Sequence, residues 1–159
     1  MLNPSTLIGL VNLLTLHMTK NLESLIVKTA NGNTEAQKFL ELWYSYAHQF
    51  DDLIDERFSV VDLINANNEL ARLLTTEFFE SHKFLLLPQL YLAAEAYQAS
   101  ETTQKDTFVG TYLSHEGNNM LRTVALITGG WRLLAEVSEE IRRITYLEHP
   151  PLEHLPIKD

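Results

Sequence analysis

Four carboxylates stand within six residues of this chain, at Asp51, Asp52, Asp55 and Glu56. They fall at the end of a strongly periodic helical segment. The partial negative charge of a helix C-terminus disfavours each acidic side chain there by a few tenths to about 1 kcal/mol. A cluster that carries this cost favours a compensating cation, and Mg²⁺, or Mn²⁺ in its place, prefers carboxylate oxygens. We therefore predict a divalent metal site with Asp51, Asp52 and Asp55 as ligands, supported by Glu56 and His48.

A second group of polar residues recurs at helical spacing further along the chain: Thr111, His115, Asn118, Asn119 and Arg122. A guanidinium can hold a phosphate through two hydrogen bonds, which makes Arg122 a candidate phosphate ligand. His115 is a candidate acid or base, because the histidine side chain ordinarily titrates near neutral pH. Adjacent asparagines are unfavourable inside a helix, so Asn118 and Asn119 are candidates for substrate binding.

Both groups also have a purely structural interpretation. Any helix of a bundle needs a solvated face, adjacent asparagines can face water, and Gly117 permits close packing of helices. The acidic face differs from an ordinary solvated face in its sign pattern, because it holds no Lys or Arg before Arg57, whereas solvated faces usually mix the two signs. The sequence does not show whether the two groups share a pocket.

Helical periodicity predicts the elements that position these residues. A first helix starts after Asn3-Pro4-Ser5 and ends at Asn31-Gly32-Asn33, a typical C-terminal stop. A second follows at once, opened by a capping box of Thr34 and Gln37, and runs to about Glu56 or Phe58. The acidic cluster therefore lies at the C-terminal end of this second helix.

A third helix can start at Ser59, with Asp62 in its first turn. Residues 75–87 either continue it or form a separate helix. Pro88 marks a break or kink, after which a helix runs to about Ser100.

The pattern of apolar residues in the C-terminal third of the chain predicts two more helices. One spans about 105–128 and is stopped by Gly129-Gly130, and the other spans about 131–146. No alternating strand pattern is present. We predict an all-α fold, a single antiparallel bundle of five to six helices in residues 1–146, followed by a proline-containing tail at 147–159.

The amino-acid composition excludes some classes of binding partner. Twelve Lys and Arg against 21 Asp and Glu give a net charge of −9, which argues against nucleic acid and against anionic membrane surfaces. The apolar run from Leu7 to Leu16 is too short to span a bilayer. The chain has no cysteine, which excludes thiolate chemistry and is compatible with the reducing cytoplasm.

The run Asp51-Asp52-Leu53-Ile54-Asp55, after an aromatic-rich helix, resembles the first aspartate-rich motif (DDxxD) of the isoprenoid synthases. With the trailing Glu56 it is similar to the squalene and phytoene synthase branch. In that family the motif closes a helix that lines a central cavity and binds the Mg²⁺ that holds a prenyl diphosphate. The resemblance implies the three aspartates as metal ligands. A second aspartate-rich motif is absent, and Arg122 and Leu126 stand where the family's other second motif has Ser or Thr and then Glu.

Two functions follow as hypotheses. The first is a divalent-metal-dependent protein that binds, or acts on, a diphosphate-containing small molecule. The second is a non-catalytic helical module that pairs with another protein or with a second copy of itself, its acidic face merely solvated.

Overall fold

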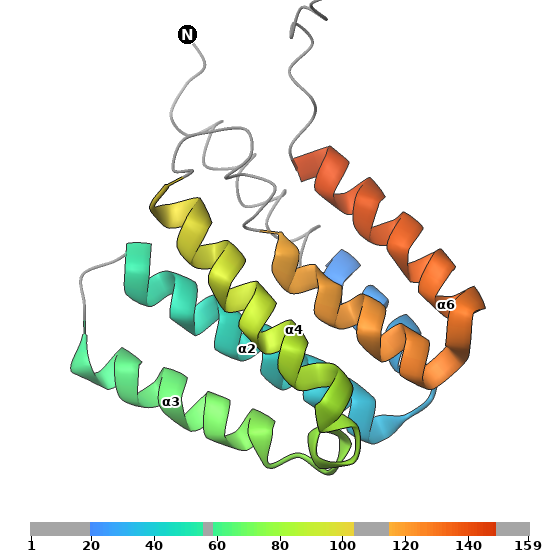
Figure 1. The fold of residues 1–159 in the computed structure, drawn as a ribbon, viewed down its shortest axis with the longest axis horizontal. Helices are drawn as coiled ribbons and strands as arrows, with labels where there is room; N and C mark the ends of the chain where they lie inside the picture. Colours follow the sequence, from blue (N-terminus) through green and yellow to red (C-terminus); the bar gives the residue numbers. More distant parts are fainter. Residues whose placement is uncertain (1–19, 56–58, 104–114, 149–159) are drawn as a thin grey trace, which may run out of the picture.

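The computed structural model describes residues 20–55, 59–103 and 115–148. These residues form a helical segment at 20–30, then α2 (Thr34–Asp55), α3 (Val60–Leu74), α4 (Glu77–Glu101), the short 3-10 turn η1 (Glu116–Asn118) and α6 (Asn119–Glu148). Within these ranges there is no strand. The predicted all-α bundle is confirmed (Figure 1). Over the same ranges, no helix is both long and apolar enough to cross a membrane.

The turn between the first helix and α2 lies where the sequence places it. Asn31 and Gly32 have positive φ angles of 49° and 79°, and a left-handed residue is a common helix stop. The predicted capping box of Thr34 and Gln37 is wrong. The side-chain oxygen of Asn33 accepts the hydrogen bond from the Ala36 N–H at 3.0 Å, because Asn33 is the last residue outside the helix. Thr34 already lies inside α2.

The start of α3 is confirmed. The Ser59 hydroxyl accepts a hydrogen bond from the Asp62 N–H at 3.4 Å. Residues 75–87 belong to a separate helix, because Thr76 caps a new start by accepting from the Phe79 N–H at 3.2 Å.

The predicted break at Pro88 is wrong, because Pro88 lies inside α4 with helical backbone angles. Its ring fixes φ near −65°, which suits a helix, at the cost of one backbone hydrogen bond. The distortion lies six residues earlier, at His82, with φ −125° and ψ 17°.

Gly130 divides α6 into two arms, as the Gly129-Gly130 pair predicts. Its backbone angles, φ 67° and ψ −162°, lie in a region open almost only to glycine. Figure 1 shows the second arm running back beside the first. Thr128 joins this reversal of α6 to the turn that precedes α2. Its hydroxyl donates to the Thr29 carbonyl at 2.7 Å, and its backbone carbonyl accepts from the Asn31 side-chain amide at 2.9 Å.

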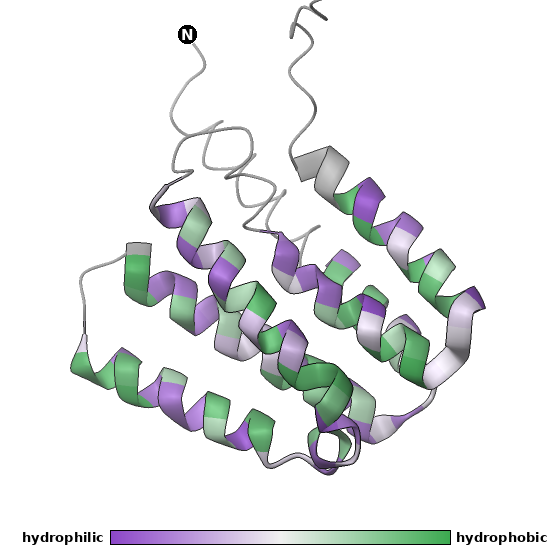
Figure 2. Ribbon diagram, in the orientation of Figure 1, coloured by the Kyte–Doolittle hydropathy of each residue, from purple (hydrophilic) through white to green (hydrophobic). Residues whose placement is uncertain are grey.

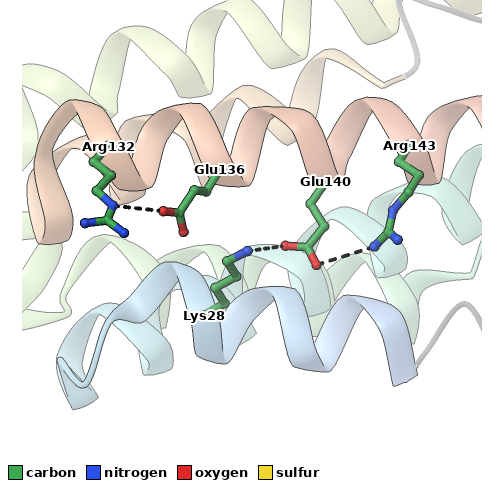
Figure 3. A network of polar contacts seen from close by, with 5 residues as sticks. All are labelled: Lys28, Arg132, Glu136, Glu140 and Arg143. Atoms are coloured by element: carbon green, nitrogen blue, oxygen red, sulfur yellow. Dashed lines mark hydrogen bonds and ion pairs between the residues drawn. The ribbon is translucent and has the colours of Figure 1, made fainter.

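Ion pairs run along the second arm of α6 (Figure 3). Glu140 accepts from Lys28 at 2.9 Å and also pairs with Arg143 at 3.5 Å, and Arg132 pairs with Glu136 at 3.2 Å. The hydrogen bond to Glu140 is the main reason that the pKa of Lys28 lies above its ordinary value. Lys28 thereby joins the first described helix to the returning arm of α6.

The core lies where α2, α3, α4 and α6 meet. Phe39 is fully buried and contacts the rings of Phe78 and Phe79 at centroid distances of 5.5 and 6.3 Å. Around these rings the cluster contains side chains from each helix, with Leu40, Leu73, Leu86, Met120, Leu121, Val124 and Val137 all fully buried. The packed core therefore holds the N-terminal half of α2.

We expect Gly130→Ala to lower the free energy of unfolding by about 1–3 kcal/mol, because alanine is strained at this φ and ψ. An added Cβ would meet no atom within 4 Å, so a loss measured by urea denaturation reports the backbone conformation alone. The control is Glu139→Ala at an exposed position of the same element, with an expected change within about 0.5 kcal/mol. Equal stability of the two variants would contradict the prediction.

Candidate ligand-binding cavity

A cavity of about 630 Å³ lies among α2, α3 and α4. Leu70 and Leu74 of α3 and Leu87 and Leu90 of α4 line it together with an unusually large set of aromatic side chains: Trp43, Tyr44, Tyr46, Phe50, Tyr91 and Tyr97. Small-molecule sites typically have volumes of about 300–1,000 Å³ and apolar walls with a few polar groups. The cavity therefore has the size and lining of a site for a mainly apolar ligand.

Asp51 and His48 contribute a carboxylate and an imidazole to this wall. The half-buried Asp51 accepts a hydrogen bond of 2.5 Å from the Tyr97 hydroxyl, across the boundary between α2 and α4. Phe50 supports this contact, with its ring 5.9 Å from the Tyr97 ring. A carboxylate offers about four acceptor positions, so Asp51 keeps capacity for a second partner while Tyr97 fixes its orientation.

The structure brings two of the five predicted metal ligands, Asp51 and His48, to the cavity wall. Asp52 is exposed and does not line the cavity, because adjacent helical residues point about 100° apart. Asp55 ends α2, and its side chain and Glu56 lie outside the described residues. Among the residues that the structure describes, no three His, Asp or Glu side chains are grouped to hold a metal ion. The metal site stays a prediction.

The second polar group is not on a continuous α-helix. Residues 104–114, including Thr111, lie outside the description, and the described part begins with a turn at His115 and a 3-10 turn over Glu116–Asn118. The adjacent asparagines therefore stand at the start of α6, where asparagine is favourable. Their position therefore has a structural explanation, and substrate binding by Asn118 and Asn119 stays a prediction.

Arg122 takes part in the same local network. It donates to the side-chain oxygen of Asn119, whose amide in turn donates to Glu116. Arg122 is half-buried, and burial is the main cause that lowers its pKa; the positive charge of Arg142 acts in the same direction. Arg122 does not line the cavity.

Two hydrogen bonds join α2 to the turn before α6. The Trp43 indole N–H donates to the Gly117 carbonyl at 3.2 Å, and the Tyr44 hydroxyl donates to the Asn118 side-chain oxygen at 2.7 Å. Tyr44 and Gly117 also line the cavity. The two groups predicted from the sequence therefore lie on neighbouring elements, with Tyr44 between the cavity and Asn118.

Sequence reasoning missed the aromatic wall. The Tyr97 contact to Asp51 joins residues 46 positions apart, so no local spacing predicts it. The sequence did contain one indication of polar contacts here. Tyr91 and Tyr97 stand on either side of Glu95 in a segment that is otherwise mainly apolar. Buried tyrosines usually find a polar partner for their hydroxyl.

We expect Tyr44→Phe to lower the free energy of unfolding by about 0.5–1.5 kcal/mol, the usual value of one hydrogen bond. Loss of the bond to Asn118 leaves the rest of the ring in place. Tyr91→Phe is the matched control, since Tyr91 is 70% exposed and its change should stay within about 0.5 kcal/mol. Chemical denaturation measures both, and a larger loss at Tyr91 than at Tyr44 would refute the assigned role.

Comparison with known proteins found no match: no protein-family model, no curated protein and no solved structure is significantly similar to this chain.

Proposed function

We propose that this protein binds an amphipathic small molecule that combines an apolar chain with a diphosphate, and that it does so with a divalent metal ion. The apolar chain occupies the cavity among α2, α3 and α4, and the diphosphate lies at the acidic end of α2. The observation that carries the proposal is the placement of Asp51, the first aspartate of the acidic run, on the wall of an aromatic-lined cavity.

The apolar part of the ligand is supported by the lining. Leucines and aromatic rings contribute most of the cavity wall, and burial of apolar surface is worth about 25 cal/mol per Å². The rings of Tyr46, Phe50 and Tyr97 follow one another at centroid distances of 5.9 Å. A flexible hydrocarbon chain fits against such a surface without specific polar contacts.

The metal-dependent part is supported by the chemistry of Mg²⁺. This ion is usually held by one or two protein carboxylates together with water and substrate phosphates. Asp51 at the cavity and the exposed Asp52 beside it supply such a minimal set, with Asp55, Glu56 and His48 as candidates for support. In this proposal the diphosphate completes the metal shell, so a preformed group of three ligands is not required.

The residues near α6 take a positioning role. Asn118 accepts from Tyr44 and so fixes this residue of the cavity wall, whereas Asn119 accepts from Arg122 next to it. His115 does not line the cavity. The proposal therefore describes binding and assigns no chemical step to any residue.

Thermal melts with defined probes test the proposal. We expect farnesyl diphosphate with Mg²⁺ to raise the melting temperature, with a stabilisation of about 2.7 kcal/mol at a hundredfold excess over Kd. Farnesol with Mg²⁺, inorganic pyrophosphate with Mg²⁺, and farnesyl diphosphate with EDTA should each give a much smaller shift, because each lacks one part of the interaction. Equal shifts for farnesol and farnesyl diphosphate would exclude the metal-dependent part.

Three variants locate the site in the same assay. Asp51→Asn and Asp52→Asn should abolish the Mg²⁺-dependent shift, and Ala47→Leu should reduce it by filling the cavity. Glu139→Gln removes the same charge from an exposed position away from the cavity and should leave the shift unchanged. A response that survives Asp51→Asn would place the ligand elsewhere.

A helical interaction module is the second candidate function. The observation that favours it is the exposure of large apolar side chains on α4, with Phe84 87% exposed and Tyr91 70% exposed.

A further inference from the structure

The charges around the cavity among α2, α3 and α4 suit a positively charged ligand. Neither Lys nor Arg is among the described residues that line the cavity, and its carboxylate is that of Asp51. The whole chain carries a net charge of −9, and such a field raises the local concentration of cations rather than of anions. An organic cation therefore matches this wall without a bridging metal ion.

The aromatic rings of the wall are tilted against one another. Tyr46 lies between Trp43 and Phe50, at centroid distances of 6.2 and 5.9 Å, and Phe50 lies 5.9 Å from Tyr97. The successive ring planes are inclined by 46°, 39° and 66°, so none of these neighbours stack in parallel and cover each other's faces. The face of an aromatic ring is the negative side of its quadrupole and attracts a cation. Several inclined rings around one cavity are the typical binding site of a quaternary ammonium group.

Asp51 adds a full negative charge beside these rings. The Tyr97 hydroxyl donates to its Oδ1 atom at 2.5 Å, and the carboxylate is half-buried on the cavity wall. Because a carboxylate offers about four acceptor positions, this one neutral hydrogen bond orients the group without compensating its charge. A charge in a partly desolvated site interacts more strongly with an opposite charge than it does in bulk water.

The remainder of the wall is largely aliphatic. Figure 2 shows hydrophobic colour on both α3 and α4, and these two helices contribute four leucines to the cavity: Leu70, Leu74, Leu87 and Leu90. We propose that the cavity binds an organic cation, a quaternary ammonium ion that carries an alkyl chain. The ammonium group lies against the aromatic rings beside Asp51, and the chain lies against the leucines. This class of ligand differs from the diphosphate proposed above and requires no metal ion.

Isothermal titration calorimetry with hexyltrimethylammonium in EDTA tests the proposal, and the EDTA makes the result independent of the Mg²⁺-dependent ligand. Choline should displace this probe at about tenfold lower concentration than 3,3-dimethyl-1-butanol, which has the same shape but no charge, because only the cation interacts with the ring faces and with Asp51. The proposal is overturned if choline and the neutral alcohol compete equally. It is also overturned if hexyltrimethylammonium does not bind up to roughly 10 mM, at which a site with Kd of about 1 mM would be largely occupied.

Substitutions locate the binding site in the same titration. Asp51→Asn keeps the shape of the side chain and should weaken hexyltrimethylammonium binding by about tenfold, whereas Glu139→Gln, at an exposed position outside the cavity, should leave it unchanged. Phe50→Leu should weaken binding by about fivefold, because it removes a ring face but keeps an apolar side chain. Phe50→Tyr retains the ring and should bind like the wild type. Wild-type affinity in both Asp51→Asn and Phe50→Leu would place the cation elsewhere and overturn the proposal.

Discussion

The candidate site depends on the contact between Trp43 of α2 and Gly117 in the turn before α6. The side chain of Trp43 is 4% exposed, and its indole N–H donates to the Gly117 carbonyl. The indole ring lies close enough to Gly117 that an added Cβ there would stand 3.6 Å from Cζ2, an ordinary van der Waals distance. This contact fixes the middle of α2 against the turn before α6. The next residue, Tyr44, then reaches Asn118, and the wall of the cavity follows from there.

The described bundle is packed at one end of α2 and open at the other. Up to Trp43 the apolar side of α2 is buried, with Phe39 and Leu40 fully enclosed. Beyond it, Phe50 and Ile54 are 40% and 45% exposed, although they continue the same apolar stripe. The packed end supplies the stability of the bundle, because buried apolar area is the main stabilising term. At the open end the aromatic side chains line the cavity.

The two sides of α4 differ in what covers them. Its inner side packs into the core through the fully buried Leu86. On its other side, Phe84 and Leu85 are 87% and 51% exposed, so no described helix covers them. Leu87 and Tyr91 line the cavity and are themselves exposed. The uncharged middle of α4 is therefore shared among the core, the cavity and the surface.

The sequence by itself determined the elements and the points at which the chain turns. Ser59 as a cap and the stops at Asn31-Gly32 and Gly129-Gly130 were all predictable, because capping and positive φ depend on a few neighbouring residues. Errors arose where two local signals competed. Asn33 rather than Thr34 caps α2, and α4 distorts at His82 rather than at Pro88.

The tertiary structure decided what the candidate site consists of. The acidic run was visible in the sequence, but only packing selects Asp51 for the cavity wall and leaves Asp52 in solvent. The contacts of Asp51 with Tyr97 and of Tyr44 with Asn118 join residues 46 and 74 positions apart. Periodicity says which face of a helix is polar, yet it carries no information on which other helix that face will meet. That choice is made by the packing of the core.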